Sequence, residues 1–200
     1  MIKYFDIFAG IGGFRSGLEK AGGFQCVGYC EIDKYAKKAY ETLYDTENEV
    51  YYDDARKIDP NELPDLDLIC GGFPCQSFSI AGKRKGFSDT RGTLFFEIAR
   101  IAAIKKPKYL LLENVPGLLS HNGGRTFATI LGTLDELGYD VVWEVLNSAN
   151  FGVAQSRKRV FIVGFHREKC SGKVLSFTDA NPKTLVQRIS GREGNRVYSA

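Results

Sequence analysis

The stretch that decides the fold is residues 3–31, which read KYFDIFAGIGGFRSGLEKAGGFQCVGYCE. The pattern predicts a strand over Lys3–Phe8, a glycine-rich turn, a helix over Phe14–Ala21 and a second strand over Gln25–Cys30. Glycines between a strand and a helix let the backbone approach a ligand closely, and the N-terminus of a helix favours a negative group. Such a unit is typical of a parallel sheet with helices on its faces.

The same alternation of strands and helices continues along the chain. The nearly unbroken apolar run Tyr109–Leu112 is typical of a strand buried on both faces. Residues 1–165 are therefore predicted to form an α/β domain, a Rossmann-like, doubly wound and mostly parallel sheet. Residues 166–200 are more polar and are expected to be a poorly ordered linker. The other helices are expected over 33–44, 91–104 and 126–137, and the other strands over 49–52, 66–70, 141–146 and 160–165.

The composition is that of an ordinary globular domain. Of the 200 residues, 44% are hydrophobic and 26% are charged, which excludes disordered, collagen-like and disulfide-stapled chains. The net charge of +3 permits a nucleic-acid partner without arguing for one. Five cysteines leave at least one thiol unpaired, and the apolar runs are shorter than a signal peptide or a membrane helix needs. We therefore expect a cytoplasmic protein with reduced thiols and no membrane contact.

The glycine turn has an acidic partner further along the chain. Glu31 follows the second predicted strand, where an acid suits the two hydroxyl groups of a ribose. Together they predict a nucleoside cofactor, and Asp54, after the third strand, could hydrogen-bond an adenine amino group. The third glycine is misplaced for the dinucleotide fingerprint, which disfavours a hydride-transfer enzyme. The alternative is a tight strand–helix turn with two solvated acids.

A candidate nucleophile follows the fourth predicted strand. Cys75 lies in the loop GGFPCQSFS, residues 71–79, beyond a strand end where ligands bind in such folds. Pro74 fixes one backbone dihedral beside it. The cysteines at 26, 30 and 70 lie in strands and are expected to be small buried hydrophobes. The two histidines lie far in sequence from Cys70 and Cys75, so neither a metal site nor a Cys/His hydrolase is favoured.

Glu113 ends the buried strand YLLLE and should lie at the same sheet edge as Cys75. In protonated form it could donate to a ring nitrogen and accept from an exocyclic amine. The alternative is a strand-end acid in solvent.

Four motifs in this order resemble the C5 cytosine-specific DNA methyltransferases, mainly the bacterial modification enzymes. They are DIFAGIGGF (6–14), GGFPCQSFS (71–79), ENV (113–115) and QSRKR (155–159). RGTLFFEIARI (91–101) and VLNSANFGVAQSRKRVFIVGF (145–165) extend the similarity, which covers residues 1–165. The resemblance implies the S-adenosylmethionine-dependent methyltransferase fold, with double-stranded DNA as substrate and S-adenosylhomocysteine as product. In a bacterium it also implies association with the nucleoid.

The resemblance also implies roles for individual residues. The cysteine would add to C6 of a cytosine flipped out of the duplex, so that C5 can take the methyl group. The basic loop over 83–85 would close over DNA, or is a solvated surface loop. The implied catalytic residues are Cys75, Glu113, Arg157 and Arg159; the cofactor residues are Phe8, Gly10, Gly12, Gly13, Glu31, Asp54 and Leu94; the DNA-binding residues are Ser79, Lys83, Arg84 and Gln155.

Members of this family usually continue with a target-recognition domain, a further catalytic motif and a closing C-terminal helix. GREGNRVYSA, residues 191–200, resembles the start of the recognition region. We therefore expect a truncated product, a natural fragment or one subunit of a split enzyme, with a complementary C-terminal half as partner. The alternatives are a non-catalytic module that binds cofactor or DNA, and a related tRNA cytosine methyltransferase.

Overall fold

The computed structural model describes residues 1–74 and 94–170 and the backbone of residues 187–189. Strands and helices alternate in chain order, as the sequence predicts. The elements are β1 (Ile2–Ile7), α1 (Gly13–Ala21), β2 (Phe24–Cys30), α2 (Lys34–Leu43), β3 (Val50–Tyr52), η1 (Ala55–Lys57), β4 (Leu68–Gly72), α3 (Leu94–Lys105), β5 (Tyr109–Asn114), α4 (Gly117–Ser120), α5 (Arg125–Glu136), β6 (Tyr139–Asn147), η2 (Ser148–Phe151), β7 (Lys158–His166) and β8 (Gln187–Ile189).

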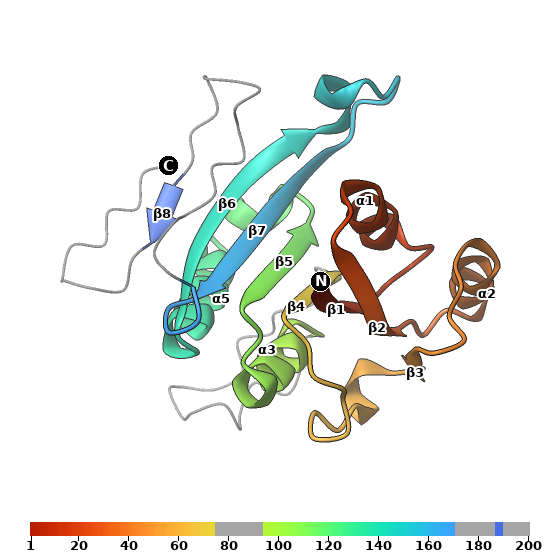
Figure 1. Cartoon of the computed structure of the whole chain (residues 1–200). Coiled ribbons are helices and arrows are strands. Elements are labelled where there is room, and N and C mark those ends of the chain that lie inside the picture. The colour runs from red at the N-terminus through yellow and green to blue at the C-terminus, as the bar shows by residue number, and fades with distance from the viewer. Residues whose placement is uncertain (75–93, 171–186, 190–200) are drawn as a thin grey trace.

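The strands form one sheet in the order β3-β2-β1-β4-β5-β7-β6-β8 (Figure 1). The strands β3, β2, β1, β4 and β5 are parallel to one another. In contrast, β7 runs antiparallel to both β5 and β6. The expected mostly parallel sheet is confirmed. The antiparallel end arises because β6 and β7 are joined by a short hairpin connection over 148–157, whereas a parallel pair needs a long crossover.

Helices cover both faces of the sheet. On one face, Leu18 of α1 packs with Tyr4 and Leu68, and Tyr40 of α2 packs with Tyr29. The opposite face carries the larger core, in which β1, β4 and β5 pack against α3 and α5. Because both faces are covered, the last four residues of β1, Tyr4–Ile7, are all buried although they point alternately to the two faces.

Several element ends differ from the sequence-based expectation. β1 ends at Ile7, one residue early, because Phe8 has a positive φ of 57° that is incompatible with an extended strand. β5 runs on to Asn114, so Glu113 is the second-last residue of the strand rather than its last. β8 lies inside the segment expected to be a linker and pairs with β6. Within 1–74 and 94–170, no helix is long and apolar enough to cross a membrane.

Gly71 gives a direct test of how closely β1 and β4 approach. A Cβ atom at Gly71 would lie 2.0 Å from the backbone oxygen of Ile7, a contact that only movement of a strand can relieve. Gly71→Ala should therefore lower the free energy of unfolding by about 3 kcal/mol, measured by urea denaturation. Gly132, in α5, has open space around its Cβ position, so Gly132→Ala should raise stability by up to about 1 kcal/mol. Equal effects at the two positions would contradict this packing.

Candidate active site

The predicted site residues gather at one edge of the sheet. The parallel strands β1 to β5 all end there, and β7, which runs the other way, begins there (Figure 1). Chain order along the sheet reverses between β1 and β4, the place where open α/β sheets bind ligands beyond their strand ends. The residues at this edge are Phe8, Gly10, Gly12, Gly13, Glu31, Asp54, Glu113, Arg157 and Arg159.

Glu31 holds the glycine turn in place. Its Oε2 accepts a hydrogen bond of 2.7 Å from the Gly10 amide, and its Oε1 accepts one of 2.7 Å from the Asp33 amide. Asp33 in turn caps α2 through the amides of Tyr35 and Ala36. The carboxylate therefore ties the turn after β1 to the start of α2. Each carboxylate oxygen keeps a lone pair that can accept a hydroxyl group of a ligand.

The turn itself leaves room above its backbone. Gly10 and Gly12 have φ values of 57° and 88°, a left-handed conformation that favours glycine. No atom lies within 4 Å of a Cβ position at Gly10 or Gly13. The prediction that a ligand can approach this backbone closely is compatible with that space.

Apolar side chains flank the turn. Phe8 is half-buried and packs against the main core, whereas Ile11 and Ile32 are 62% and 69% exposed. These two isoleucines could not be predicted from the sequence, because an apolar residue in a loop carries no signal until its exposure is known. They offer an apolar surface beside Glu31 of the kind that lines small-molecule sites.

Asp54 and Leu94 lie further from the turn in sequence. Asp54 follows β3 and caps η1, and its carboxylate accepts hydrogen bonds from the side chain of Arg56. This hydrogen bonding holds the pKa of the Asp54 carboxyl below its ordinary value. Leu94 is the first residue of α3 and is half-buried. Contact of either residue with a cofactor stays a prediction.

Glu113 and Arg159, which the sequence analysis placed in the site separately, form an ion pair. The distance from Arg159 Nε to Glu113 Oε1 is 2.6 Å, and the two side chains are 21% and 24% exposed. In β4, Gly72 lies in register with Glu113, and a Cβ atom there would be 2.9 Å from Oε2. The absence of a side chain at Gly72 therefore leaves room for the carboxylate, which reaches the surface at the strand end.

Asn114, the last residue of β5, lies beside Glu113 and was given no role in the sequence-based prediction. Its side chain is buried; Nδ2 donates to the Phe73 carbonyl at 2.7 Å, and Oδ1 accepts from the Val115 amide at 2.8 Å. The only sequence signal is an amide side chain at the end of an apolar strand. The bond ties the segment that leads into Pro74 to the strand that carries Glu113.

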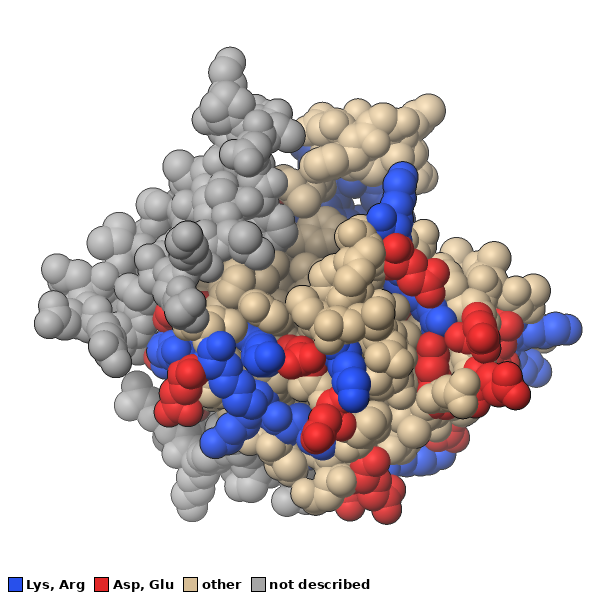
Figure 2. Space-filling model, in the orientation of Figure 1, with Lys and Arg blue, Asp and Glu red and all other residues tan. Residues whose placement is uncertain are grey.

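The β6–β7 connection presents Gln155 and Arg157 on an ordered backbone. The Arg157 amide donates to Asn147 Oδ1 at 3.0 Å and to Ser148 Oγ at 3.1 Å, and Ser148 Oγ donates to the Gln155 carbonyl. Both predicted side chains are exposed. On the face seen in Figure 2, basic and acidic side chains of the described residues are interspersed.

The remaining predicted residues, Cys75, Ser79, Lys83 and Arg84, lie outside the described residues. Of the cysteines in strands, Cys30 and Cys70 are buried as expected, whereas Cys26 is half-buried. Burial raises the pKa of the Cys26 and Cys30 thiols to about 12 and also raises that of Cys70. These three thiols are therefore poor nucleophiles at neutral pH.

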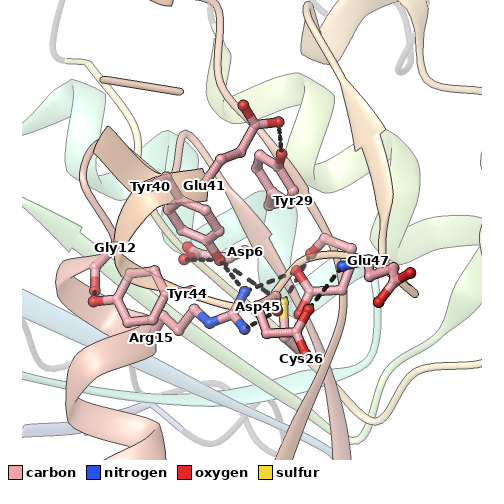
Figure 3. Close-up of polar contacts among 12 residues, drawn as sticks. Asp6, Gly12, Arg15, Cys26, Tyr29, Tyr40, Glu41, Tyr44, Asp45 and Glu47 are labelled. Atoms are coloured by element: carbon pink, nitrogen blue, oxygen red, sulfur yellow. Dashed lines mark hydrogen bonds and ion pairs between the residues drawn. The ribbon is translucent and has the colours of Figure 1, made fainter. Parts of the chain in front are cut away.

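A buried carboxyl lies beneath the glycine turn. Asp6, in β1, is fully buried and accepts a hydrogen bond of 3.4 Å from the Tyr40 hydroxyl (Figure 3). The Cys70 thiol lies 3.7 Å from its other oxygen. Burial raises the pKa of Asp6 to about 8, although these two hydrogen bonds and the nearby Arg15 oppose the rise. Asp6 is thus protonated at neutral pH in the folded protein.

Together, the fold and this edge define an α/β domain with a glycine turn held by Glu31 on one side of the switch point and an Arg-paired carboxylate on the other. The chain matches the C-5 cytosine-specific DNA methylase family over residues 2–196, so it belongs to that family. It is 51% identical over 197 residues to the type II methyltransferase M1.ScrFI of Lactococcus lactis subsp. cremoris, covering 98% of this chain and 49% of the relative.

A second relative matches this chain with similar identity and coverage. The type II methyltransferase M.HhaI of Haemophilus parahaemolyticus is 44% identical over 167 residues, covering 84% of this chain and 50% of the relative. The chain thus spans about half the length of the curated relatives it matches. Among solved structures, a Spodoptera frugiperda DNMT2 mutant superposes with a TM-score of 0.68 at 22% identity, covering 84% of this chain and 50% of that one. At this identity the likeness concerns the fold alone, which is the methyltransferase fold.

Asn114→Ala should destabilise the edge between β4 and β5. It leaves the buried Phe73 carbonyl without its partner, which should lower the free energy of unfolding by about 2 kcal/mol in urea denaturation. Asn61 is exposed and bonds only to Asp59 through its side chain, so Asn61→Ala should change stability by less than about 0.5 kcal/mol. A small loss at Asn114, equal to that at Asn61, would show that the Phe73 carbonyl is not held in this way.

Asp6 should make stability depend on pH. Its pKa is raised to about 8 in the folded state and is about 3.9 in an unfolded chain, so its contribution is present below about pH 4 and is lost as the pH rises toward 8. Asp6→Asn removes this titration. The stability of the wild type relative to Asp6→Asn should therefore fall by about 2 kcal/mol between pH 5 and pH 7, measured by urea denaturation at each pH. A difference that is constant with pH would contradict the assignment.

Proposed function

We propose that this chain is the catalytic part of a DNA cytosine-5 methyltransferase. It would transfer a methyl group from S-adenosylmethionine to C5 of a cytosine flipped out of duplex DNA, through a covalent bond to Cys75. Family membership supports cytosine methylation, and the arrangement of the sheet edge supports the roles of individual residues.

One observation carries the proposal. Glu113 is in register with Gly72, is paired with Arg159, and lies at the same sheet edge as the glycine turn held by Glu31. Cys75 follows Gly72 by three residues, and Asn114 anchors the intervening Phe73. The short connection from Gly72 to Cys75 supports a role for Cys75 beside the candidate ring-binding carboxylate.

The residues of this chain would divide the work on the target ring. The Cys75 thiolate adds to C6, which makes C5 electron-rich enough to take the methyl group. Glu113 holds N3 and the exocyclic amine, and Arg159 orients Glu113 through the ion pair. After the transfer, loss of the C5 proton to a base lets the bond between Sγ and C6 break, which frees Cys75. Cys26, Cys30 and Cys70 lie in strands, and burial raises the pKa of each thiol, which disfavours them in this role.

The residues around the glycine turn fit a methyl-donor nucleoside. When bound, S-adenosylmethionine supplies a sulfonium methyl group to the nucleophilic carbon. Glu31 has lone pairs free for the ribose hydroxyls, and Gly10 and Gly13 leave open space beside the helix N-terminus. Phe8 would contact the adenine, Gly12 would shape the turn, and Asp54 and Leu94 would contact the adenine amine and the methionine part.

DNA would meet the same edge from the side of β7. Arg157 and Gln155 are exposed on the anchored β6–β7 connection, where they would contact the target strand. Ser79, Lys83 and Arg84 are proposed to contact the duplex beside the flipped base. Because the chain spans about half of its relatives, we propose a complementary C-terminal half as the partner that selects the target sequence.

Trapping the covalent intermediate tests this proposal. The chain, with the C-terminal half of M1.ScrFI supplied in trans, is incubated with S-adenosylmethionine and a duplex that contains 5-fluorocytosine, in which fluorine blocks the final elimination. A protein–DNA band that survives denaturing electrophoresis is expected from the wild type. Glu113→Gln should slow adduct formation by about 100-fold, because an amide cannot pass a proton to N3 of the ring as the thiolate adds to C6.

Two variants control this experiment. Cys75→Ser should form no adduct, whereas Cys170→Ser should form as much as the wild type, because its thiol bonds to the Lys108 carbonyl at the opposite sheet edge. The absence of an adduct from the reconstituted protein, or an equal yield from Cys75→Ser, would contradict the proposal. Transfer to tRNA but not to duplex DNA would favour the tRNA enzyme instead.

A further inference from the structure

The glycine turn is held from below by a tyrosine that no sequence motif singled out. The hydroxyl of Tyr44, at the C-terminal end of α2, donates to the Gly12 carbonyl at 2.9 Å. The same carbonyl accepts the first hydrogen bond of α1, from the Ser16 amide, also at 2.9 Å. A Cβ atom at Gly12 would lie 2.3 Å from the ring of Tyr44, so the ring packs directly against the turn.

Arg15 holds Tyr44 in this position. Its guanidinium lies over the Tyr44 ring, 4.6 Å from the ring centre, and over the Tyr40 ring at 5.2 Å (Figure 3). The guanidinium donates to Glu19, Glu49 and the Asp45 carbonyl, each at 2.8 Å. A buried arginine held by several hydrogen bonds has little freedom to move, so the ring stacked on it is held in one place.

Two hydrogen bonds therefore hold the turn, one made by a backbone amide and the other by a backbone carbonyl. Glu31 accepts from the Gly10 amide, and Tyr44 donates to the Gly12 carbonyl. Ile11, between these points, is turned outward and is 62% exposed. Gly12 caps α1 without any hydrogen bond from a side chain of its own, so the tyrosine supplies the fixation at this end that a capping residue usually gives.

We propose that Tyr44, fixed by Arg15, is a positioning residue that sets the shape of the glycine turn for the cofactor. The link to the cofactor rests on the function proposed above. The turn needs glycine at position 12 for its left-handed φ, and glycine is also the residue most free to leave that conformation. Tyr44 and Arg15 restrict that freedom before the ligand arrives, and pre-organisation of this kind lowers the entropic cost of binding.

Tyr44→Phe tests the proposal because it removes only the hydroxyl and keeps the ring. Two quantities are measured on the full chain: hydrogen exchange of the Gly10 and Gly12 amides, and the Kd for S-adenosylmethionine by calorimetry. Loss of the single hydrogen bond should speed exchange at both amides about fivefold and weaken binding about fivefold. Tyr44→Leu, which also removes the ring, should have larger effects on both quantities.

Tyr139→Phe is the matched control. Its buried hydroxyl also donates to a backbone carbonyl, that of Pro107, at 2.8 Å, but at the opposite edge of the sheet. It should lose stability without changing exchange at Gly10 or Gly12 or the Kd. A merely structural role of Tyr44 would make the two variants alike.

The outcomes separate this proposal from the function on which it rests. Exchange at Gly10 and Gly12 that is unchanged in Tyr44→Phe overturns the positioning role, and so does faster exchange with an unchanged Kd. A wild-type chain that binds no S-adenosylmethionine contradicts the proposed function. In that case the exchange rates still decide whether Tyr44 sets the shape of the turn.

Discussion

The pairing of β4 with β5, completed by the hydrogen bond from Asn114 to the Phe73 carbonyl, is the constraint on which the site depends. Parallel pairing sets Glu113 beside Gly72, and the buried amide then carries the alignment past the end of β4. Breaking a buried hydrogen bond of this kind is costly, because the buried carbonyl oxygen is then left without a water molecule as a replacement partner. The segment that leads into Cys75 is therefore held in a fixed position relative to the strand that carries Glu113.

The two sides of the site are joined through β1. The glycine turn continues directly from β1, and β1 pairs with β4, where Gly71 packs against the Ile7 backbone. A methyl donor at the turn and a target ring at Glu113 would therefore lie on either side of β4, two strand spacings apart. The buried Asp6, Arg15 and Tyr40 beneath the turn make this side stiff as well. Rigidity on both sides suits a transfer between two ligands that must meet in one geometry.

Local patterns predicted most of the fold, because apolar periodicity and glycine punctuation mark strands, helices and turns. Glu31 could be placed for the same reason, since it directly follows a strand whose neighbour carries the turn. Pairings that depend on register could not: nothing local indicates that Arg159 meets Glu113, that Asn114 reaches Phe73 or that Tyr44 reaches Gly12. The antiparallel β7 and the left-handed Phe8 were also missed, because both follow from how the chain closes in three dimensions.

The central claim is that Cys75, and no other thiol, attacks the target base beside Glu113. Peptide mapping of the complex with 5-fluorocytosine DNA tests it most directly. Trypsin releases residues 58–83 as one peptide that contains both Cys70 and Cys75, so fragment ions must locate the nucleotide within it. The account predicts the modified cytosine on Cys75 alone. A nucleotide found on Cys70, or on any cysteine outside that peptide, would contradict it.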